Sequence, residues 1–422
     1  MNEWVESPLY QLATFQKGRK VDTSPFNGDG CAPYLGASGL EGGDDGFAAT
    51  RLAVIAKSTD TLMLWDGERS GLVGYGRQGV VASTVSKLSP SDKVEPKYLY
   101  YALSERFDWI QHRRTGTGVP HVPKDLGRLL KLCYPRQRTI QQRIATILTG
   151  IDTAIEKTEA LIAKYQQIKA GLMHDLFTRG VLPNGQLRPL REQSPELYQE
   201  TAIGWIPREW GVSTLEDLLA PLPNNIRSGP FGSALLKHEL VEDGIPFLGI
   251  DNIHTEHFEP EFRRFVSERK FLELAKYKVR PRDVVITIMG TVGRCCVIPE
   301  DLELALSSKH LWTMTFDPEK VFPGLVCWQL NHSSWAQAWF RRAMQGGIMD
   351  AIQSSTLKTL QLPVPSIDEQ ALINARYSKI STRILQDTKQ LEKLRKQKTG
   401  LMHDLLTGKV TVPTCDPGGA NA

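Results

Sequence analysis

The chain has 422 residues, of which 41% are hydrophobic and 23% are charged, and its net charge is +4. This length and composition predict two or three globular domains that bury cores of their own. The small net charge excludes a uniformly basic surface, so any anion-binding surface must be local.

The N-terminal residues lack the basic and apolar regions of a signal peptide, and no run of 18 apolar residues occurs. We therefore expect neither a secretion leader nor a transmembrane helix. The six cysteines include no Cys-x-x-Cys pair. Their pattern favours reduced thiols in a cytoplasmic protein over a zinc site or a disulfide framework.

Residues 1–134 predict a β-rich domain, because short apolar runs alternate with glycine, proline and aspartate. We expect strands over residues 52–55, 62–65 and 79–85, and a short helix over residues 96–103. Gly74, Gly76 and Gly79 have the spacing of a dinucleotide-binding loop, but a strand-like run follows them instead of a helix. These glycines are therefore interpreted as a β-turn.

A long amphipathic helix is expected within residues 135–180, where apolar residues recur every three or four positions as in a coiled coil. The apolar positions are Ile140, Ile144, Ile147, Ile151, Ile155, Ile162, Tyr165, Ile168, Leu172 and Leu176. Thr139 and Gln142 have capping-box spacing. A helix of about 37 residues is about 55 Å long, longer than the roughly 34–36 Å of one DNA turn. Prolines and an Asn-Gly pair predict a linker over residues 181–208.

The second half of the chain repeats this order. Residues 209–362 predict another β-rich domain, with strands over 284–289 and 310–316 and a helix over 323–330. Residues 363–410 predict a second long helix, opened by a Ser366–Glu369 capping box, and residues 411–422 predict a flexible tail.

An internal repeat joins the two halves. Gly-Leu-Met-His-Asp-Leu at residues 171–176 recurs at residues 400–405, and Pro135 with Gln142 corresponds to Pro363 with Gln370. The sequence therefore predicts an α+β fold with internal duplication. In it, two β-rich globular domains are separated by two long helices that form an antiparallel coiled coil.

Motifs for catalysis are mostly missing. The sequence has no phosphate-binding G-x-x-x-x-G-K-[ST] loop, no G-x-S-x-G elbow, and no Asn-Pro-Pro-Tyr or Asp-Pro-Pro-Tyr tetrapeptide for methylating an adenine amine. His174-Asp175 and His403-Asp404 suggest a metal-dependent hydrolase, but neighbouring helix residues point about 100° apart. We expect a recognition protein without a catalytic residue or a metal site.

The chain resembles the specificity subunit of type I restriction–modification systems. The resemblance rests on Gly204-Trp205-Ile206-Pro207, on residues 246–253 and 283–293, and on the two Gly-Leu-Met-His-Asp-Leu segments. It implies that residues 1–134 and 209–362 are target recognition domains that read the two halves of a split, asymmetric site in double-stranded DNA. It further implies two methyltransferase subunits docked on the helices, and motor–nuclease subunits beside them. S-adenosylmethionine, ATP and Mg would belong to those partners, with no cofactor in this chain.

Two sets of candidate residues follow. Cationic and polar side chains in the two domains are candidates for reading bases or positioning on phosphates. These are Arg69, Arg77, Gln78, Arg113, Arg114, Lys237, His238, Arg263, Arg264, Arg294, Lys309, His310, Arg341 and Arg342. The repeated helix endings are candidates for contacts with partner subunits, through Leu172, His174, Asp175, Leu401, His403 and Asp404.

Two other interpretations remain open at this level. The chain could be a coiled-coil adaptor that joins two protein partners without DNA, in which case it would lack salt-dependent DNA affinity. It could also be an autonomous enzyme with a divergent active site, which the missing motifs argue against.

Overall fold

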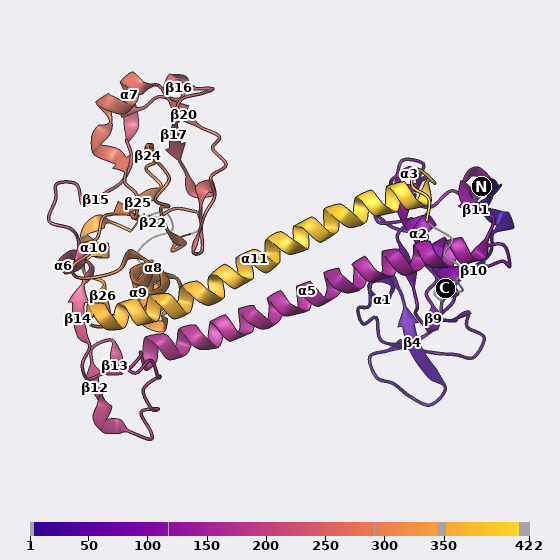
Figure 1. Cartoon of the computed structure of the whole chain (residues 1–422), viewed down its shortest axis with the longest axis horizontal. Coiled ribbons are helices and arrows are strands. Elements are labelled where there is room, and N and C mark those ends of the chain that lie inside the picture. The colour runs from indigo at the N-terminus through magenta and orange to yellow at the C-terminus, as the bar shows by residue number, and fades with distance from the viewer. Residues whose placement is uncertain (1–3, 117, 291, 344–351, 413–422) are drawn as a thin grey trace, which may run out of the picture. The chain divides into compact units, whose positions relative to one another are not determined.

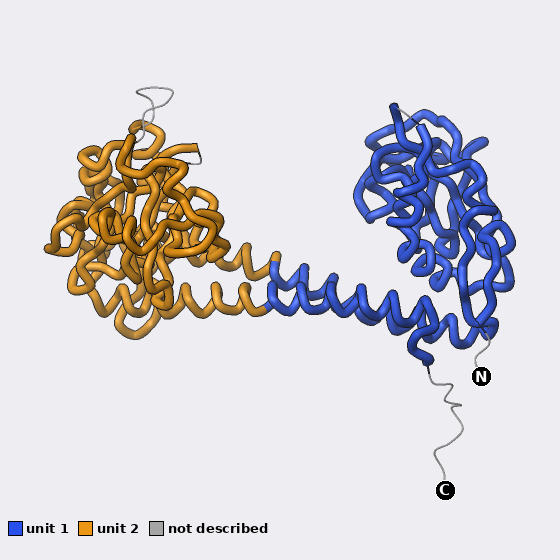
Figure 2. Tube along the Cα trace, turned by 90° about the horizontal axis from the view of Figure 1, so that it is seen from above, with its two compact units in different colours: residues 1–162, 387–422 blue, residues 163–386 orange. Residues whose placement is uncertain are grey.

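The computed structural model describes residues 4–116, 118–290, 292–343 and 352–412. The chain divides into two compact units, coloured separately in Figure 2: unit 1 holds residues 1–162 with 387–422, and unit 2 holds residues 163–386. Each unit contains a β-rich part and one segment of each of two long helices (Figure 1). No helix within the described ranges is both long and apolar enough to cross a membrane.

Unit 1 is built on two small sheets and a strand pair. The antiparallel four-stranded sheet has the order β2 (Ala13–Lys17), β10 (Val85–Pro90), β7 (Thr61–Leu64) and β8 (Val73–Tyr75). The mixed five-stranded sheet has the order β3 (Thr23–Ser24), β5 (Phe47–Ala49), β4 (Cys31–Leu35), β9 (Gly79–Val81) and β6 (Ile55–Ala56). β1 (Trp4–Pro8) pairs with β11 (Lys131–Pro135). The helices are α1 (Ala37–Leu40), α2 (Pro96–Glu105), α3 (Phe107–Gln111) and α4 (Leu126–Leu129), with a 3₁₀ turn, η1, over Leu9–Gln11.

Unit 2 repeats this arrangement. Its four-stranded sheet has the order β15 (Ile226–Arg227), β25 (Leu311–Met314), β22 (Val284–Thr287) and β23 (Cys295–Val297). Its five-stranded sheet has the order β16 (Leu240–Val241), β20 (Phe265–Val266), β17 (Ile245–Leu248), β24 (Ala305–Ser307) and β21 (Lys278–Val279). β14 (Gly211–Thr214) pairs with β26 (Gln361–Val364), β12 (Tyr198–Thr201) with β13 (Gly204–Pro207), and β18 (Ile253–His254) with β19 (His257–Phe258). The helices are α6 (Leu215–Leu218), α7 (Glu268–Glu273), α8 (Pro323–His332), α9 (Ser334–Ala343) and α10 (Ser354–Lys358). The 3₁₀ turns are η2 (Pro195–Leu197), η3 (Gly232–Ala234), η4 (Lys237–Glu239), η5 (Ile250–Asn252) and η6 (Ala275–Tyr277).

The two β-rich parts therefore share one topology, as internal duplication predicts. In each, the five-stranded sheet contains one parallel pair, β4–β9 or β17–β24. An aspartate precedes the second inner strand of each four-stranded sheet and caps the turn before it: Asp60 Oδ2 accepts from Lys57 N at 2.8 Å, and Asp283 Oδ2 accepts from Arg280 N at 2.7 Å. Asp60 and Asp283 are therefore structurally equivalent residues.

The long helices are α5 (Arg138–Thr178, 41 residues) and α11 (Ile367–Leu406, 40 residues), which pack antiparallel. In unit 1, Ile144 and Leu148 of α5 and Leu405 of α11 are buried in the core of the β-rich part. In unit 2, Phe177 of α5 and Ile373 of α11 are buried in the equivalent core. Each such side chain contributes about 1.5–3 kcal/mol on burial, which anchors each β-rich part to both helices. The expected α+β fold with two antiparallel helices is confirmed.

Some local predictions are wrong. Leu52 lies in a turn with φ of 63°, so of the expected strand 52–55 only Ile55 is extended, as the first residue of β6. The expected strand 79–85 is divided into β9 and the start of β10. Thr139 lies inside α5, so it does not cap the helix. The helices expected near residues 96 and 323 are confirmed as α2 and α8, both with proline in the first turn.

The expected apolar seam of the helices is also incomplete. Ile147 and Ile168 were assigned to it, but their exposed fractions are 39% and 46%. Leu385 of α11 is 51% exposed. The helices therefore present apolar side chains outside their contact with each other and with the β-rich parts.

Candidate nucleic-acid interface

In unit 1, two loops that are distant in sequence meet beside the four-stranded sheet. The loop that follows β7, residues 65–71, lies against residues 120–122: Gly67 N donates to Pro120 O at 2.8 Å, and Val122 N donates to Trp65 O at 2.9 Å. Gly67 and Gly71 adopt φ values of 112° and 98°, which only glycine reaches at low cost. A Cβ on Gly71 would lie 2.8 Å from Ile110 Cγ2. Glycine is thus required for this loop pairing.

The paired loops bring together three of the predicted DNA-contacting arginines. Arg114 is held by bonds to Glu68 O (2.6 Å) and Gln111 O (2.9 Å), so it joins the two loops. Arg113 stacks on Trp109 with its guanidinium carbon 3.9 Å from the ring centroid. Arg69 pairs with Glu41 at 2.7 Å, and both side chains are about half exposed. The remaining candidates of this unit, Arg77 and Gln78, are exposed between β8 and β9.

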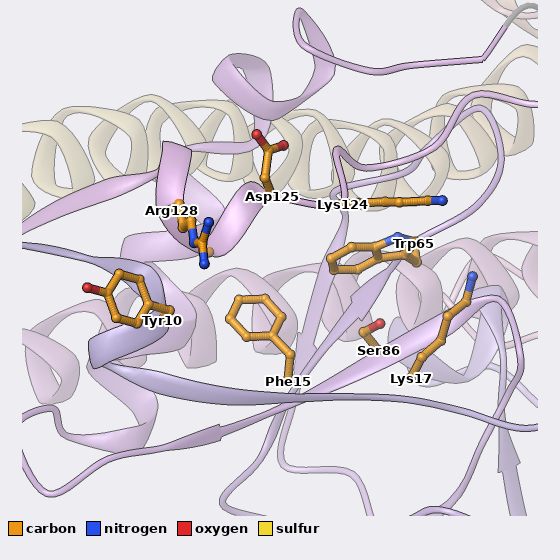
Figure 3. Close-up of a pocket in the computed structure, with 9 residues that line it drawn as sticks. Tyr10, Phe15, Lys17, Trp65, Ser86, Lys124, Asp125 and Arg128 are labelled. Carbon is orange, nitrogen blue, oxygen red and sulfur yellow. The ribbon is translucent and has the colours of Figure 1, made fainter.

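Next to these loops is a cleft of about 680 Å³ that the sequence did not reveal. Its lining combines the aromatic rings of Tyr10, Phe15 and Trp65 with the basic side chains of Lys17, Lys124 and Arg128, together with Asp125, Ser86 and Gly127. Figure 3 shows these rings and cations around one opening. Phe15 and Trp65 pack edge to face, with centroids 6.2 Å apart. Aromatic faces can hold the unstacked bases of a single strand, and cations can contact the phosphates of a single strand or of a duplex.

One carboxylate balances part of this charge. Asp66 bonds Lys17 Nζ at 2.8 Å through Oδ2, and its Oδ1 lies 2.7 Å from His121 Nδ1. Lys124 and Arg128 are both exposed, and neither forms an ion pair within the described part of unit 1. Lys17, His121, Lys124 and Arg128 were missed because Lys17 is about a hundred positions from residues 121–128, and no local pattern links the two segments.

In unit 2, the turn after β22 occupies the position of the turn after β7. Gly290 and Gly293 have φ values of 74° and 94°, and Thr287 N donates to Arg294 O at 2.9 Å. Arg294 is exposed beside this turn. His310 lies at the neighbouring strand, because Ile288 N donates to His310 O at 3.0 Å. The structure thus brings Arg294 and His310 to adjacent positions on one sheet end.

A second basic group surrounds His310. Burial and the neighbouring cations Lys309 and Arg264 lower the pKa of His310, so the neutral ring is favoured at neutral pH. A neutral imidazole can donate from one nitrogen and accept at the other, as contact with a base edge requires. Arg264 bonds Asp251, which orients its guanidinium.

The other candidates of unit 2 are dispersed. Lys237 and His238 are exposed on the 3₁₀ turn η4. Arg263 is exposed and lies 3.5 Å from Glu261. Arg341 and Arg342 are in the last turn of α9, directly before residues 344–351, which lie outside the described residues. The structure therefore places these side chains on several surfaces.

Unit 2 differs from unit 1 at the position of the aromatic cleft. Arg227 of β15 corresponds to Gln16 of β2, because Arg227 pairs with Thr313 and Gln16 pairs with the equivalent Lys87. Lys17 therefore corresponds to Ser228. Arg227 is buried and paired with Asp283, whereas its equivalent Gln16 is exposed, and Ser228 stands where unit 1 has the half-exposed Lys17. Burial lowers the pKa of Arg227 to about 10, so it stays protonated at neutral pH. Here the cation stabilises the fold instead of facing an opening.

Comparisons with known proteins agree with this arrangement. Residues 1–167 match the family model of the type I restriction modification DNA specificity domain. The MjaVIII specificity subunit of Methanocaldococcus jannaschii is 27% identical over 394 residues, which cover 91% of this chain and 87% of that protein. The EcoBI specificity subunit of Escherichia coli is 20% identical over 90% of this chain and 79% of its own length.

The chain belongs to the specificity subunits of type I restriction–modification systems.

Solved structures share the fold of this specificity subunit. The S subunit from M. genitalium aligns over 96% of both chains with a TM-score of 0.64 at 16% identity. A chain from work on complex assembly and conformational transition of the type I R-M system aligns over 96% of this chain and 98% of its own, with a TM-score of 0.50 at 14% identity. The specificity subunit is the non-catalytic subunit of these enzymes, and S-adenosylmethionine and ATP belong to the other subunits.

The repeated helix endings of the specificity subunit lie at the cores of its two units. Leu172 and Leu401 pack against those cores. Asp175 pairs with Arg179 at 3.2 Å, while His174 lines a hollow of about 510 Å³ with Trp335. His403 lies 3.7 Å from Glu105, and Asp404 lies 3.4 Å from Lys409. No cluster of three or more metal-binding side chains occurs among the described residues.

Proposed function

We propose that residues 1–134 and 209–362 are two target recognition domains, each of which reads one half of a split, asymmetric site in double-stranded DNA. The proposal rests on one observation: the two β-rich parts share a strand topology but carry different side chains at equivalent positions. The turns after β7 and β22 join equivalent strands and each contains two glycines at positive φ, yet Arg69 stands on the first and Arg294 on the second. The aromatic cleft of unit 1 includes Lys17, whereas unit 2 has Ser228 at the equivalent position. Different side chains on equivalent scaffolds read different bases.

In this proposal the helical segments 135–180 and 363–410 are spacers, 181–208 is a linker and 411–422 a flexible tail. Helices of 41 and 40 residues are about 60 Å long at 1.5 Å per residue. A rigid spacer converts its length into a fixed separation between half-sites, as dimer symmetry does in other readers.

The helices are also the proposed docking surface for two methyltransferase subunits, with motor–nuclease subunits completing the complex. A groove of about 890 Å³ runs between α5 and α11 in unit 2, and Tyr165, Ile168, Leu172, Arg376, Lys379 and Ile380 are among its lining residues. An apolar floor with a basic rim suits a partner helix. The partners would bring S-adenosylmethionine and ATP, and the complex would act in the cytoplasm, where its DNA is.

The experiment is to co-express the chain with its methyltransferase subunit and to map modified adenines in the host genome. The expected result is one split, asymmetric motif. Replacing residues 1–134 by those of a relative should change one half of the motif and leave the other half intact. An assembled complex that modifies no motif would contradict the proposal. It would favour the interpretation of the chain as a coiled-coil adaptor that joins two protein partners.

A further inference from the structure

Glu256 lies where the β-rich part of unit 2 meets both long helices. It occupies the turn between β18 and β19, and its side chain is only 11% exposed. Its carboxylate bonds Lys169 of α5 and lies 2.9 Å from His332 Nε2 at the end of α8. It also accepts a hydrogen bond from Tyr377 of α11. One side chain of the hairpin is therefore bound to three helices.

The backbone of Glu256 adopts a conformation that is uncommon for glutamate. Its φ is 59°, in the left-handed region where glycine and asparagine are favoured and glutamate is uncommon. Its N–H donates to Cys295 O at 2.9 Å, which closes the turn in this conformation. A strained conformation held by the surrounding structure points to a role for the residue that adopts it.

The groups around the carboxylate match its charge. Although burial opposes ionisation, hydrogen bonds from His332, Lys169 and Tyr377 lower the pKa of Glu256 to about 2. The Lys169 ammonium also lies 4.7 Å from the centroid of the Tyr377 ring. Tyr377 in turn packs on Trp328 of α8, with centroids 3.7 Å apart. The contact is thus a charged network enclosed by aromatic rings.

Unit 1 contains an equivalent group of a lysine, a carboxylate and a tyrosine, but the elements that supply the carboxylate and the tyrosine are exchanged. Lys398, 229 positions after Lys169 and so at the same place in the repeat, bonds Asp152 of α5 at 2.7 Å. Tyr101 of α2 donates to Asp152 at 2.7 Å. In unit 1 the carboxylate is on a helix of the pair and the phenol is on the β-rich part, while in unit 2 the reverse holds. A lysine, a carboxylate and a tyrosine join the same three parts in both units.

We propose that Glu256 is a positioning residue that fixes the second recognition domain on the helix pair, so that the complex accepts a single spacer length between half-sites. This rests on the proposed function, because it needs two half-sites read by one chain. Apolar packing alone permits small rotations of the domain at low energy, since it is not directional. Hydrogen bonds between charged groups have defined geometry and restrict such rotations.

The test uses the complete methyltransferase complex, with adenine methylation mapped across a host genome. Glu256→Gly removes the carboxylate but suits the positive φ, so the turn is retained. Glu256→Gln keeps hydrogen bonding without the charge, and serves if the glycine variant fails to fold. Glu300→Gln is the matched control, because Glu300 is an exposed acid of the same unit, 3.9 Å from Arg282.

We expect the wild type and Glu300→Gln to modify one motif with one spacer. Glu256→Gly should retain both half-site sequences but raise modification at spacers one base pair longer or shorter by at least about tenfold. Glu256→Gln should show the same change to a smaller degree. A folded Glu256 variant that modifies only the wild-type spacer would overturn the proposal. Failure of the wild-type complex to modify any split motif would instead contradict the proposed function.

Discussion

Gln141 and Gln370 make the same three hydrogen bonds in the two halves of the chain. Gln141 accepts from Glu95 N at 2.6 Å and donates to Lys93 O and Pro135 O at 3.1 and 2.8 Å. Gln370 accepts from Phe322 N at 2.9 Å and donates to Lys320 O and Pro365 O at 3.1 and 2.9 Å. Both side chains are fully buried. Each joins the first turn of a long helix to the β-rich part beside it.

Replacing Gln370 by alanine should destabilise unit 2, because one buried backbone donor and two acceptors lose their partner. We expect a loss of about 2–4 kcal/mol, measured as a lower unfolding midpoint of the full chain. Gln141→Ala should act similarly on unit 1, and the exposed Gln193→Ala is the control. Wild-type midpoints for both buried variants would contradict this account.

Glu369 should be the most sensitive acid of unit 2. It accepts from Val181 N at 2.7 Å and from Trp210 Nε1 at 3.0 Å, and it pairs with buried Arg188. Glu369→Ala would leave a buried cation without its main partner, at a cost of about 3–5 kcal/mol. Thermal unfolding of Glu369→Ala beside exposed Glu300→Gln tests this, and equal midpoints would show that the pair adds little.

Arg294→Ala should weaken recognition of the half-site read by unit 2 alone. Loss of a bidentate base contact costs about 1–3 kcal/mol, or about 5- to 150-fold in affinity. The measurement is binding of the assembled complex to DNA with either half-site altered. The variant should no longer discriminate bases in one half, while the other half is read as in the wild type. Unchanged affinity would remove Arg294 from the interface.

Lys124 and Arg128 should contribute through phosphates and without sequence preference. Each phosphate contact removed should reduce the slope of log affinity against log salt concentration by about 1. We would titrate the complex with cognate DNA between about 50 and 200 mM salt. Lys131→Ala, in β11 and paired with Glu6 at 3.5 Å, is the control. An unchanged slope in Lys124→Ala/Arg128→Ala would place the cleft away from the DNA.

Acid should remove the contribution of Glu256. Its pKa is about 2 in the folded chain against an ordinary 4.5, so its stabilisation is complete above pH 4.5 and is lost as the pH falls toward 2. The difference corresponds to about 3 kcal/mol at most. The unfolding midpoints of the wild type and Glu256→Gln should therefore converge between pH 6 and pH 3. A constant gap between them would show that the carboxylate does not titrate in this window.

The sequence by itself determined the duplicated architecture, the two long helices and the family. These features depend on local signals, which can be recognised in a sequence without knowledge of the fold. The signals are helix periodicity, prolines in first turns and the repeated Gly-Leu-Met-His-Asp-Leu. The candidate arginines could be named in the same way, as cations within the predicted domains.

Only the tertiary structure decided which side chains meet. The cleft brings together Tyr10 and Arg128, which are 118 positions apart in the sequence. Glu256 contacts Lys169, which precedes it in the sequence by 87 positions, and Tyr377, which follows it. It also decided that Ile147 and Ile168 face outward and that Arg227 is buried while its equivalent Gln16 is exposed. Such contacts depend on how loops and sheets pack on one another, and packing is not encoded in residue spacing.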